Sequence, residues 1–123
     1  MLTTTTRTLL YAMKEDSMDS NMPHYPTTDF IQILSAQKSD DVLNVFTHHP
    51  EIDLVFIDLD MDGNNTSDTI RKLKSLRRKI PVILLSSYVT FFSMRLAYDL
   101  GCEEILQTPL NESIFKNIIH KYL

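Results

Sequence analysis

Apolar residues follow two alternating spacings along the chain. Short apolar runs with strand-like composition lie at 8–13, 30–34, 52–57, 80–85 and 103–106. Segments with apolar residues at helical spacing follow most of these runs, at 39–47, 67–78, 88–100 and 111–122. Because strands that alternate with helices are joined by right-handed crossovers, this order predicts an α/β domain whose parallel sheet is covered on both faces.

Polar residues and a glycine mark several of the predicted helix ends. We expect Ser39 or Asp40 to cap the helix after the second apolar run, and Ser67 or Asp68 to cap the helix after the third. Gly101 stands directly after another helical segment, where glycine is favoured.

Residues 16–29, between the first two apolar runs, lack a clear helical pattern. They contain Pro23 and Pro26 and only a weak repeat of Met18 and Met22. Proline inside a helix removes a hydrogen bond and costs about 3 kcal/mol. We therefore expect the first helix to be short, displaced or missing, although the segment is long enough for a parallel crossover.

The composition indicates one folded domain, residues 1–123. Hydrophobic residues make up 43% and charged residues 23% of the chain, which is ordinary for a globular protein. The formal net charge of -4 predicts no general attraction to nucleic acid or anionic lipid. The basic run at 71–79 is accordingly expected to be a solvated helix face.

The sequence also restricts covalent chemistry and location. Cys102 is the single cysteine, so the chain cannot form an internal disulfide or a thiolate metal site. The chain begins without a signal-peptide pattern, and no apolar stretch approaches the ~20 residues that span a bilayer. We therefore expect a cytoplasmic protein that makes no contact with membranes.

The third apolar run ends in alternating acids, Asp58, Asp60 and Asp62, followed by Gly63. Ligands of parallel sheets bind beyond the carboxyl ends of the central strands, which places Asp58 where chemistry is expected. A calcium loop has the same initial spacing, but its closing carboxylate would fall on Thr69 and the loop should follow a helix. A haloacid-dehalogenase-like phosphatase also begins with two acids at a strand end, but the end of this chain does not supply both its downstream lysine and its acidic pair.

From the third apolar run onward, the chain resembles the receiver domain of response regulators, the CheY-like family. Asp58 matches the phosphoacceptor aspartate and Met61 the methionine that follows it, while Asp62 replaces the usual proline. The motif PVILLS leads to Ser86 at the hydroxyl position of the family. The final strand and turn, GCEEILQTP, keep the glycine, the leucine and Pro109.

This resemblance implies a flavodoxin-like, doubly wound sheet of five parallel strands in the order 2-1-3-4-5. It also implies that the chain is a signalling module and not an enzyme. Such a module would accept a phosphoryl group on Asp58 from a histidine kinase or phosphotransfer protein in a two-component phosphorelay. Two anions meet in that transfer, so a cation such as Mg²⁺ is expected to screen them. By resemblance, its ligands are Asp58, the acids Glu15 and Asp16 after the first strand, and the backbone carbonyl of Asp60.

Two departures from the family pattern lie among the charged groups. The acid pair is either Glu15 and Asp16 or, in a shifted match, Lys14 and Glu15, and the alternative is an ordinary acidic loop. Thr108 replaces the lysine that contacts the phosphoryl oxygens, directly before Pro109, which follows the cis peptide of the family. Lys14, expected at the same end of the sheet, is a candidate substitute for that missing charge.

A third departure affects the activation switch. The family couples movement of the hydroxyl, here Ser86, to rotation of an aromatic ring on the last strand, and Ile105 stands in place of that ring. The alternative function is therefore a phosphorylation-independent pseudo-receiver that acts as a dimerisation or protein-interaction module.

The helix predicted at 88–100 has apolar residues around most of its circumference. One stripe is expected to cover the sheet: Val89, Phe92, Leu96 and Leu100. A helix on one sheet face needs only that stripe, so we expect Phe91, Met94 and Tyr98 to contact a second copy or an output partner. Receivers commonly dimerise through the fourth helix, fifth strand and fifth helix, so the resemblance points to the same surface. The alternative is a set of singly exposed apolar groups, which are normal on soluble proteins.

Overall fold

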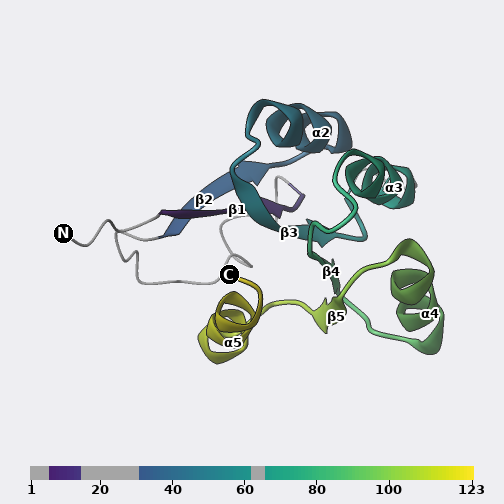
Figure 1. Ribbon diagram of the computed structural model, residues 1–123. Helices are drawn as coiled ribbons and strands as arrows, with labels where there is room; N and C mark the ends of the chain where they lie inside the picture. Colours follow the sequence, from purple (N-terminus) through teal and green to yellow (C-terminus); the bar gives the residue numbers. More distant parts are fainter. Residues whose placement is uncertain (1–5, 15–30, 62–65) are drawn as a thin grey trace.

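A five-stranded parallel sheet forms the centre of the computed structural model, which describes residues 6–14, 31–61 and 66–123 (Figure 1). The strands are β1 (Arg7–Ala12), β2 (Ile31–Ala36), β3 (Ile52–Asp58), β4 (Val82–Ser86) and β5 (Glu104–Gln107). Their order across the sheet is β2-β1-β3-β4-β5, and every neighbouring pair is parallel. The predicted fold class and strand order are confirmed.

Four helices cover the two faces of this sheet: α2 (Ser39–His48), α3 (Thr66–Leu76), α4 (Phe91–Leu100) and α5 (Glu112–Tyr122). Alternate residues of β1 separate the faces, because Leu10 and Ala12 pack with α2, α3 and α4, whereas Leu9 and Tyr11 pack with α5. Figure 1 shows α2 and α3 on one side of the sheet and α5 on the other. The segment 15–30 lies outside the described residues, so the short or missing first helix stays a prediction.

Helix ends were predicted with mixed success. Gly101 follows α4 with a positive φ of 78°, and its N–H donates to carbonyls of the last turn, as predicted. The predicted caps of α2 and α3 are wrong: α2 begins at Ser39 with Lys38 as N-cap, and α3 already begins at Thr66. Several adjacent polar residues can cap a helix, and the position at which the chain leaves the sheet determines which of them stands at the helix start.

The predicted inner stripe of α4 is also wrong in part. Phe92 is 80% exposed, and the helix instead buries Ser93, Ala97 and Leu100. The reason is a capping box at the start of the helix: the Thr90 hydroxyl accepts from the Ser93 N–H at 3.1 Å, and the Ser93 hydroxyl accepts from the Thr90 N–H at 2.8 Å. This pairing buries Ser93 and leaves the residue before it in solvent.

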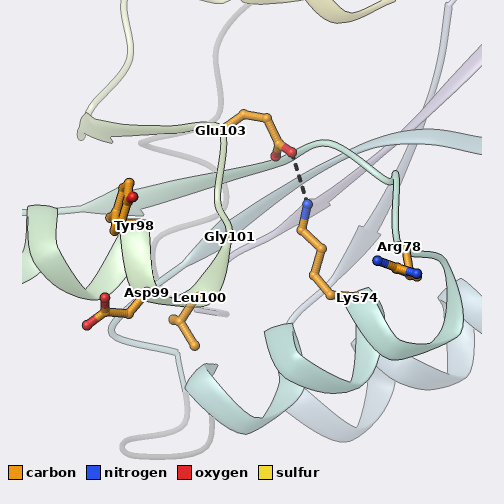
Figure 2. A pocket seen from close by; sticks show the side chains of 7 residues that line it. All are labelled: Lys74, Arg78, Tyr98, Asp99, Leu100, Gly101 and Glu103. Atoms are coloured by element: carbon orange, nitrogen blue, oxygen red, sulfur yellow. Dashed lines mark hydrogen bonds and ion pairs between the residues drawn. The ribbon is translucent and has the colours of Figure 1, made fainter.

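The basic run at 71–79 is only partly the solvated face that its charge predicted. Lys74 Nζ donates to the carbonyl of Ile80 at 2.7 Å and pairs with Glu103 at 2.9 Å (Figure 2). Arg77 donates to the carbonyl of Ile52 at 2.5 Å, and its guanidinium lies 5.4 Å from the ring centroid of Phe46. These two side chains anchor the end of α3 to the amino ends of the strands, opposite the end that carries Asp58.

None of the helices within the described ranges is long and apolar enough to cross a bilayer.

Candidate functional site

Asp58 ends β3, the central strand of the sheet, and its side chain lies at the carboxyl edge. The residue is 6% exposed. Burial raises the pKa of its carboxyl group above the ordinary value, and the negative charge of Asp60 adds to the rise, whereas a hydrogen bond from the Asp60 N–H and the positive charge of Lys14 oppose it. The hydrogen bond joins Asp60 N to Asp58 Oδ1 at 2.8 Å. One carboxylate oxygen is thus oriented by the backbone of the following loop.

Hydrogen bonds fix the chain that follows Asp58. The N–H of Leu59 donates to the carbonyl of Leu85 at 2.8 Å, which extends the ladder between β3 and β4 by one residue. Met61 is fully buried, and the Thr66 hydroxyl donates to its carbonyl at 2.9 Å. The calcium-loop interpretation is unsupported, since a strand and not a helix precedes these acids. Asp62 lies outside the described residues.

Ser86 and Thr108 lie at the carboxyl ends of the next two strands. Ser86 ends β4 and is 4% exposed, and its hydroxyl donates to the carbonyl of Tyr88 at 2.8 Å. Thr108 follows β5, and its N–H donates to the carbonyl of Ser86 at 2.9 Å. The peptide bond between Thr108 and Pro109 is cis, as the resemblance implied. Asp58, Ser86 and Thr108 therefore lie along one edge of the sheet, at the ends of three neighbouring strands.

The charged groups predicted after β1 are described only in part. Lys14 lies two residues beyond β1 and is exposed, and its positive charge opposes the rise in the pKa of Asp58. Glu15 and Asp16 lie outside the described residues, so their part in a metal site stays a prediction.

The donors that are described suit Mg²⁺ chemically. The Asp58 carboxylate and the backbone carbonyl of Asp60 are hard oxygen ligands, and Mg²⁺ prefers one or two carboxylates together with waters. Within the described residues, no group of three or more His, Cys, Asp or Glu side chains is placed to hold a metal ion. A complete site would therefore draw on the predicted acids after β1.

Ile105, the position of the family's switch aromatic, is half-buried. It pairs in register with Leu84 and packs against the core cluster that lies beneath α2, α3 and α4. Cys102 is also half-buried against this cluster, and burial raises the pKa of its thiol to about 12. A thiol with that pKa is a poor nucleophile at neutral pH, so Cys102 contributes to packing rather than to chemistry.

Sequence reasoning missed Tyr11, which lies beneath the site on the α5 face of the sheet. Its ring is fully buried and stacks on Phe56 with centroids 5.3 Å apart, while the Phe115 ring lies 6.2 Å away. Burial and the charge of Asp58 both raise the pKa of the Tyr11 hydroxyl. Tyr11 stands within the first apolar run, but its proximity to Asp58 depends on the pairing of β1 with β3.

Comparison with known proteins agrees with this architecture. A family model described as the response regulator receiver domain matches residues 17–120. Among solved structures, the chemotaxis response regulator CheY4 of Vibrio cholerae is 13% identical, with a TM-score of 0.80 over 97% of this chain and 100% of that one. A receiver domain protein from Clostridium thermocellum is 23% identical, with a TM-score of 0.78 over 94% and 93%. A two-component response regulator from Clostridium difficile is 16% identical, with a TM-score of 0.81 over 94% of each chain.

At these identities the solved structures establish the fold alone, whereas the family match rests on the sequence itself. It spans most of the chain and includes Asp58, Ser86 and Thr108. This chain belongs to the response regulator receiver domain family of two-component signalling.

Proposed function

We propose that residues 1–123 act as one receiver domain that accepts a phosphoryl group on Asp58 from the phosphohistidine of a histidine kinase or a phosphotransfer protein. The family is a signalling family, and its members interact with such donors. The observation that carries the proposal is the position of Asp58, a buried carboxylate at the carboxyl end of the central strand. Ligands bind at that edge in open parallel sheets.

The surroundings of Asp58 suit it to act as a nucleophile. Burial makes the carboxylate more basic, and the Asp60 N–H holds one of its oxygens at 2.8 Å. In the transfer, an Asp58 oxygen bonds to phosphorus while the P–N bond to the donor imidazole breaks, and the imidazole nitrogen keeps the electron pair. Ser86 and Thr108, at the adjacent strand ends, would donate hydrogen bonds to phosphoryl oxygens, and the Ser86 hydroxyl would first leave the Tyr88 carbonyl to which it now donates.

Mg²⁺, when bound, supplies positive charge that screens the incoming phosphoryl oxygens from the carboxylate. The Asp58 carboxylate and the Asp60 carbonyl would hold it, with Glu15 and Asp16 as the further ligands expected from the resemblance. Lys14 contributes a second positive charge near Asp58. Thr108 has a neutral hydroxyl where the family has a lysine, so one charge-assisted bond, roughly twice as strong as a neutral one, is missing.

A phosphorylation-independent interaction module is the second candidate function. Two observations favour it: Thr108 adds no charge to the site, and the half-buried Ile105 has no ring with which to report a movement of Ser86. Such a module would need the receiver fold but not the chemistry of Asp58.

Titration with beryllofluoride, followed by two-dimensional amide NMR, distinguishes the two functions. We expect saturable, Mg²⁺-dependent shifts in the wild type, centred on the ends of β3, β4 and β5, and no such shifts in Asp58→Asn. Asp53→Asn is a matched control because Asp53 lies at the opposite end of the same strand. A folded wild type that shows no response at saturating Mg²⁺ would favour the interaction module instead.

A further inference from the structure

A small hollow lies between the ends of α2 and α3, which pack side by side on one face of the sheet (Figure 1). Its volume is about 200 Å³, and its lining residues come from both helix ends: Phe46, Thr47, Pro50, Leu76 and Arg77. Sites for small organic ligands usually measure about 300–1,000 Å³. The hollow is therefore of a size to receive one inserted side chain rather than a free metabolite.

The polar side chains around the hollow already have partners within the chain. The Thr47 hydroxyl donates to two carbonyls of its own helix, at 2.9 and 3.1 Å. Arg77 donates to the carbonyl of Pro50 at 3.3 Å, and its guanidinium lies over the Phe46 ring. The hollow therefore offers a fixed and mainly apolar surface, which suits an apolar guest better than a polar one.

Leu76 extends this apolar surface beyond the hollow. It is the last residue of α3 and remains 55% exposed. Because Leu76 forms part of the wall, a side chain that enters the hollow also covers it. Burial of apolar surface then supplies the attraction, and the fixed wall limits the entropy lost on binding. The exposed Lys72 lies one turn before Leu76 on the same side of α3.

Unbalanced positive charge accompanies the apolar surface. Residues 72–79 contain five cations and no acid. Lys74 pairs with Glu103, and no other cation of this run has a carboxylate partner among the described residues. Glu51, in the turn after α2, is held by His49 at 2.7 Å. The charge of the run is therefore available to acidic groups of another molecule.

The combination of hollow and charge favours a protein partner. A nucleic acid would use the cations, but its phosphate backbone has no apolar side chain for the hollow, and the net charge of -4 opposes its approach. A bilayer takes up apolar faces that protrude from a protein, whereas the apolar surface here is recessed. An acidic protein segment satisfies both features at once.

We propose that the ends of α2 and α3 bind an acidic segment of a partner protein, which inserts one large apolar side chain into the hollow and places its carboxylates near Lys72 and the cations after α3. The hollow lies toward the amino ends of the strands, since Arg77 bonds to the first residue of β3. Asp58 lies at the opposite end of that strand. The contact is therefore independent of the function proposed for Asp58.

Titration of the whole chain with two short peptides, followed by two-dimensional amide NMR, tests the proposal. One peptide has a single leucine between two runs of glutamate, and the other has alanine in place of the leucine. We expect the leucine peptide to cause saturable shifts at Thr47 and Leu76, and the alanine peptide to bind about tenfold more weakly, because less apolar surface is buried. Lys72→Glu should weaken binding of the leucine peptide by about fivefold, with a smaller loss at high salt.

Charge reversal on the other face of the sheet supplies the matched control. Lys116 lies on α5 and is exposed to a similar degree, so Lys116→Glu should leave binding of the leucine peptide unchanged. Duplex DNA and vesicles of phosphatidylglycerol test the other anionic partners. Absence of saturable shifts with the leucine peptide at millimolar concentration overturns the proposal, and so does equal binding of the two peptides. Binding of the DNA or the vesicles that depends on Lys72 and is tighter than that of the leucine peptide would also overturn it.

Discussion

We expect the loss of Glu103 to weaken the fold clearly without changing the carboxyl edge of the sheet, where Asp58 lies. Its two carboxylate oxygens serve two partners: Oε1 pairs with Lys74 Nζ at 2.9 Å, and Oε2 accepts the N–H of Val82 at 2.5 Å. The side chains of Lys74 and Glu103 are only 17% and 30% exposed. Glu103 thus joins the end of α3 to the amino end of β4.

The size of the effect follows from these contacts. A hydrogen bond to a charged acceptor contributes about 1.5–3 kcal/mol, and its loss in Glu103→Ala also leaves the Val82 N–H without its acceptor. The ion pair is partly screened by solvent and adds about 0.5 kcal/mol. We expect a decrease of roughly 2.5 kcal/mol in the free energy of unfolding, which corresponds to about 10 °C in Tm for a domain of this size. Glu103→Gln keeps one neutral acceptor and should lose about half as much.

Urea unfolding followed by circular dichroism measures these differences, and a double-mutant cycle with Lys74→Met isolates the ion pair. Asp68→Ala is the control, because its pair with Arg71 is exposed and should change the free energy of unfolding by less than about 0.5 kcal/mol. If Glu103→Ala were no more destabilised than Asp68→Ala, the proposed link between α3 and β4 would be wrong.

Three further outcomes are expected. Thr108→Lys should increase the extent of labelling by acetyl phosphate, since it adds a cation at the phosphoryl position; unchanged or reduced labelling would contradict the missing-charge argument. Burial raises the pKa of the Asp58 carboxyl group in the folded protein above its value in the unfolded chain. The protonated carboxyl group therefore contributes stability that is complete below the pKa of the unfolded chain and is lost as the pH rises through the pKa of the folded protein. Asp58→Asn should therefore be more stable than the wild type near neutral pH, with an advantage that shrinks on acidification; an advantage that grows in acid would refute this sign. Cys102 has a pKa of about 12, so iodoacetamide at pH 8 should modify the native thiol far more slowly than the unfolded one, and equal rates would show that the thiol is not protected.

The sequence alone predicted the order and type of the described elements. Short continuous apolar runs identified the five strands, because strands of a covered parallel sheet are buried on both faces, and apolar residues at a spacing of 3.6 identified the four helices. Gly101 and the final turn at Pro109 were predicted as well, the first from the backbone freedom of glycine and the second from family resemblance. The position of Asp58 at a strand end followed from the same local pattern and from the rule for ligand sites in parallel sheets.

Other features were decided only when segments distant in sequence packed together. Lys74 looked like one of several solvated cations, yet it meets Glu103, 29 residues away, and Tyr11 reaches the neighbourhood of Asp58 through the pairing of β1 with β3. The rotation of α4 about its axis, which exposes Phe92 and buries Ser93, was set by a capping box and by contact with the sheet rather than by the number of apolar residues. The spacing of hydrophobic residues determines which residues share a face of a helix or strand. The tertiary structure determines which groups pack against that face, and therefore how far each side chain is buried and which charges lie near it.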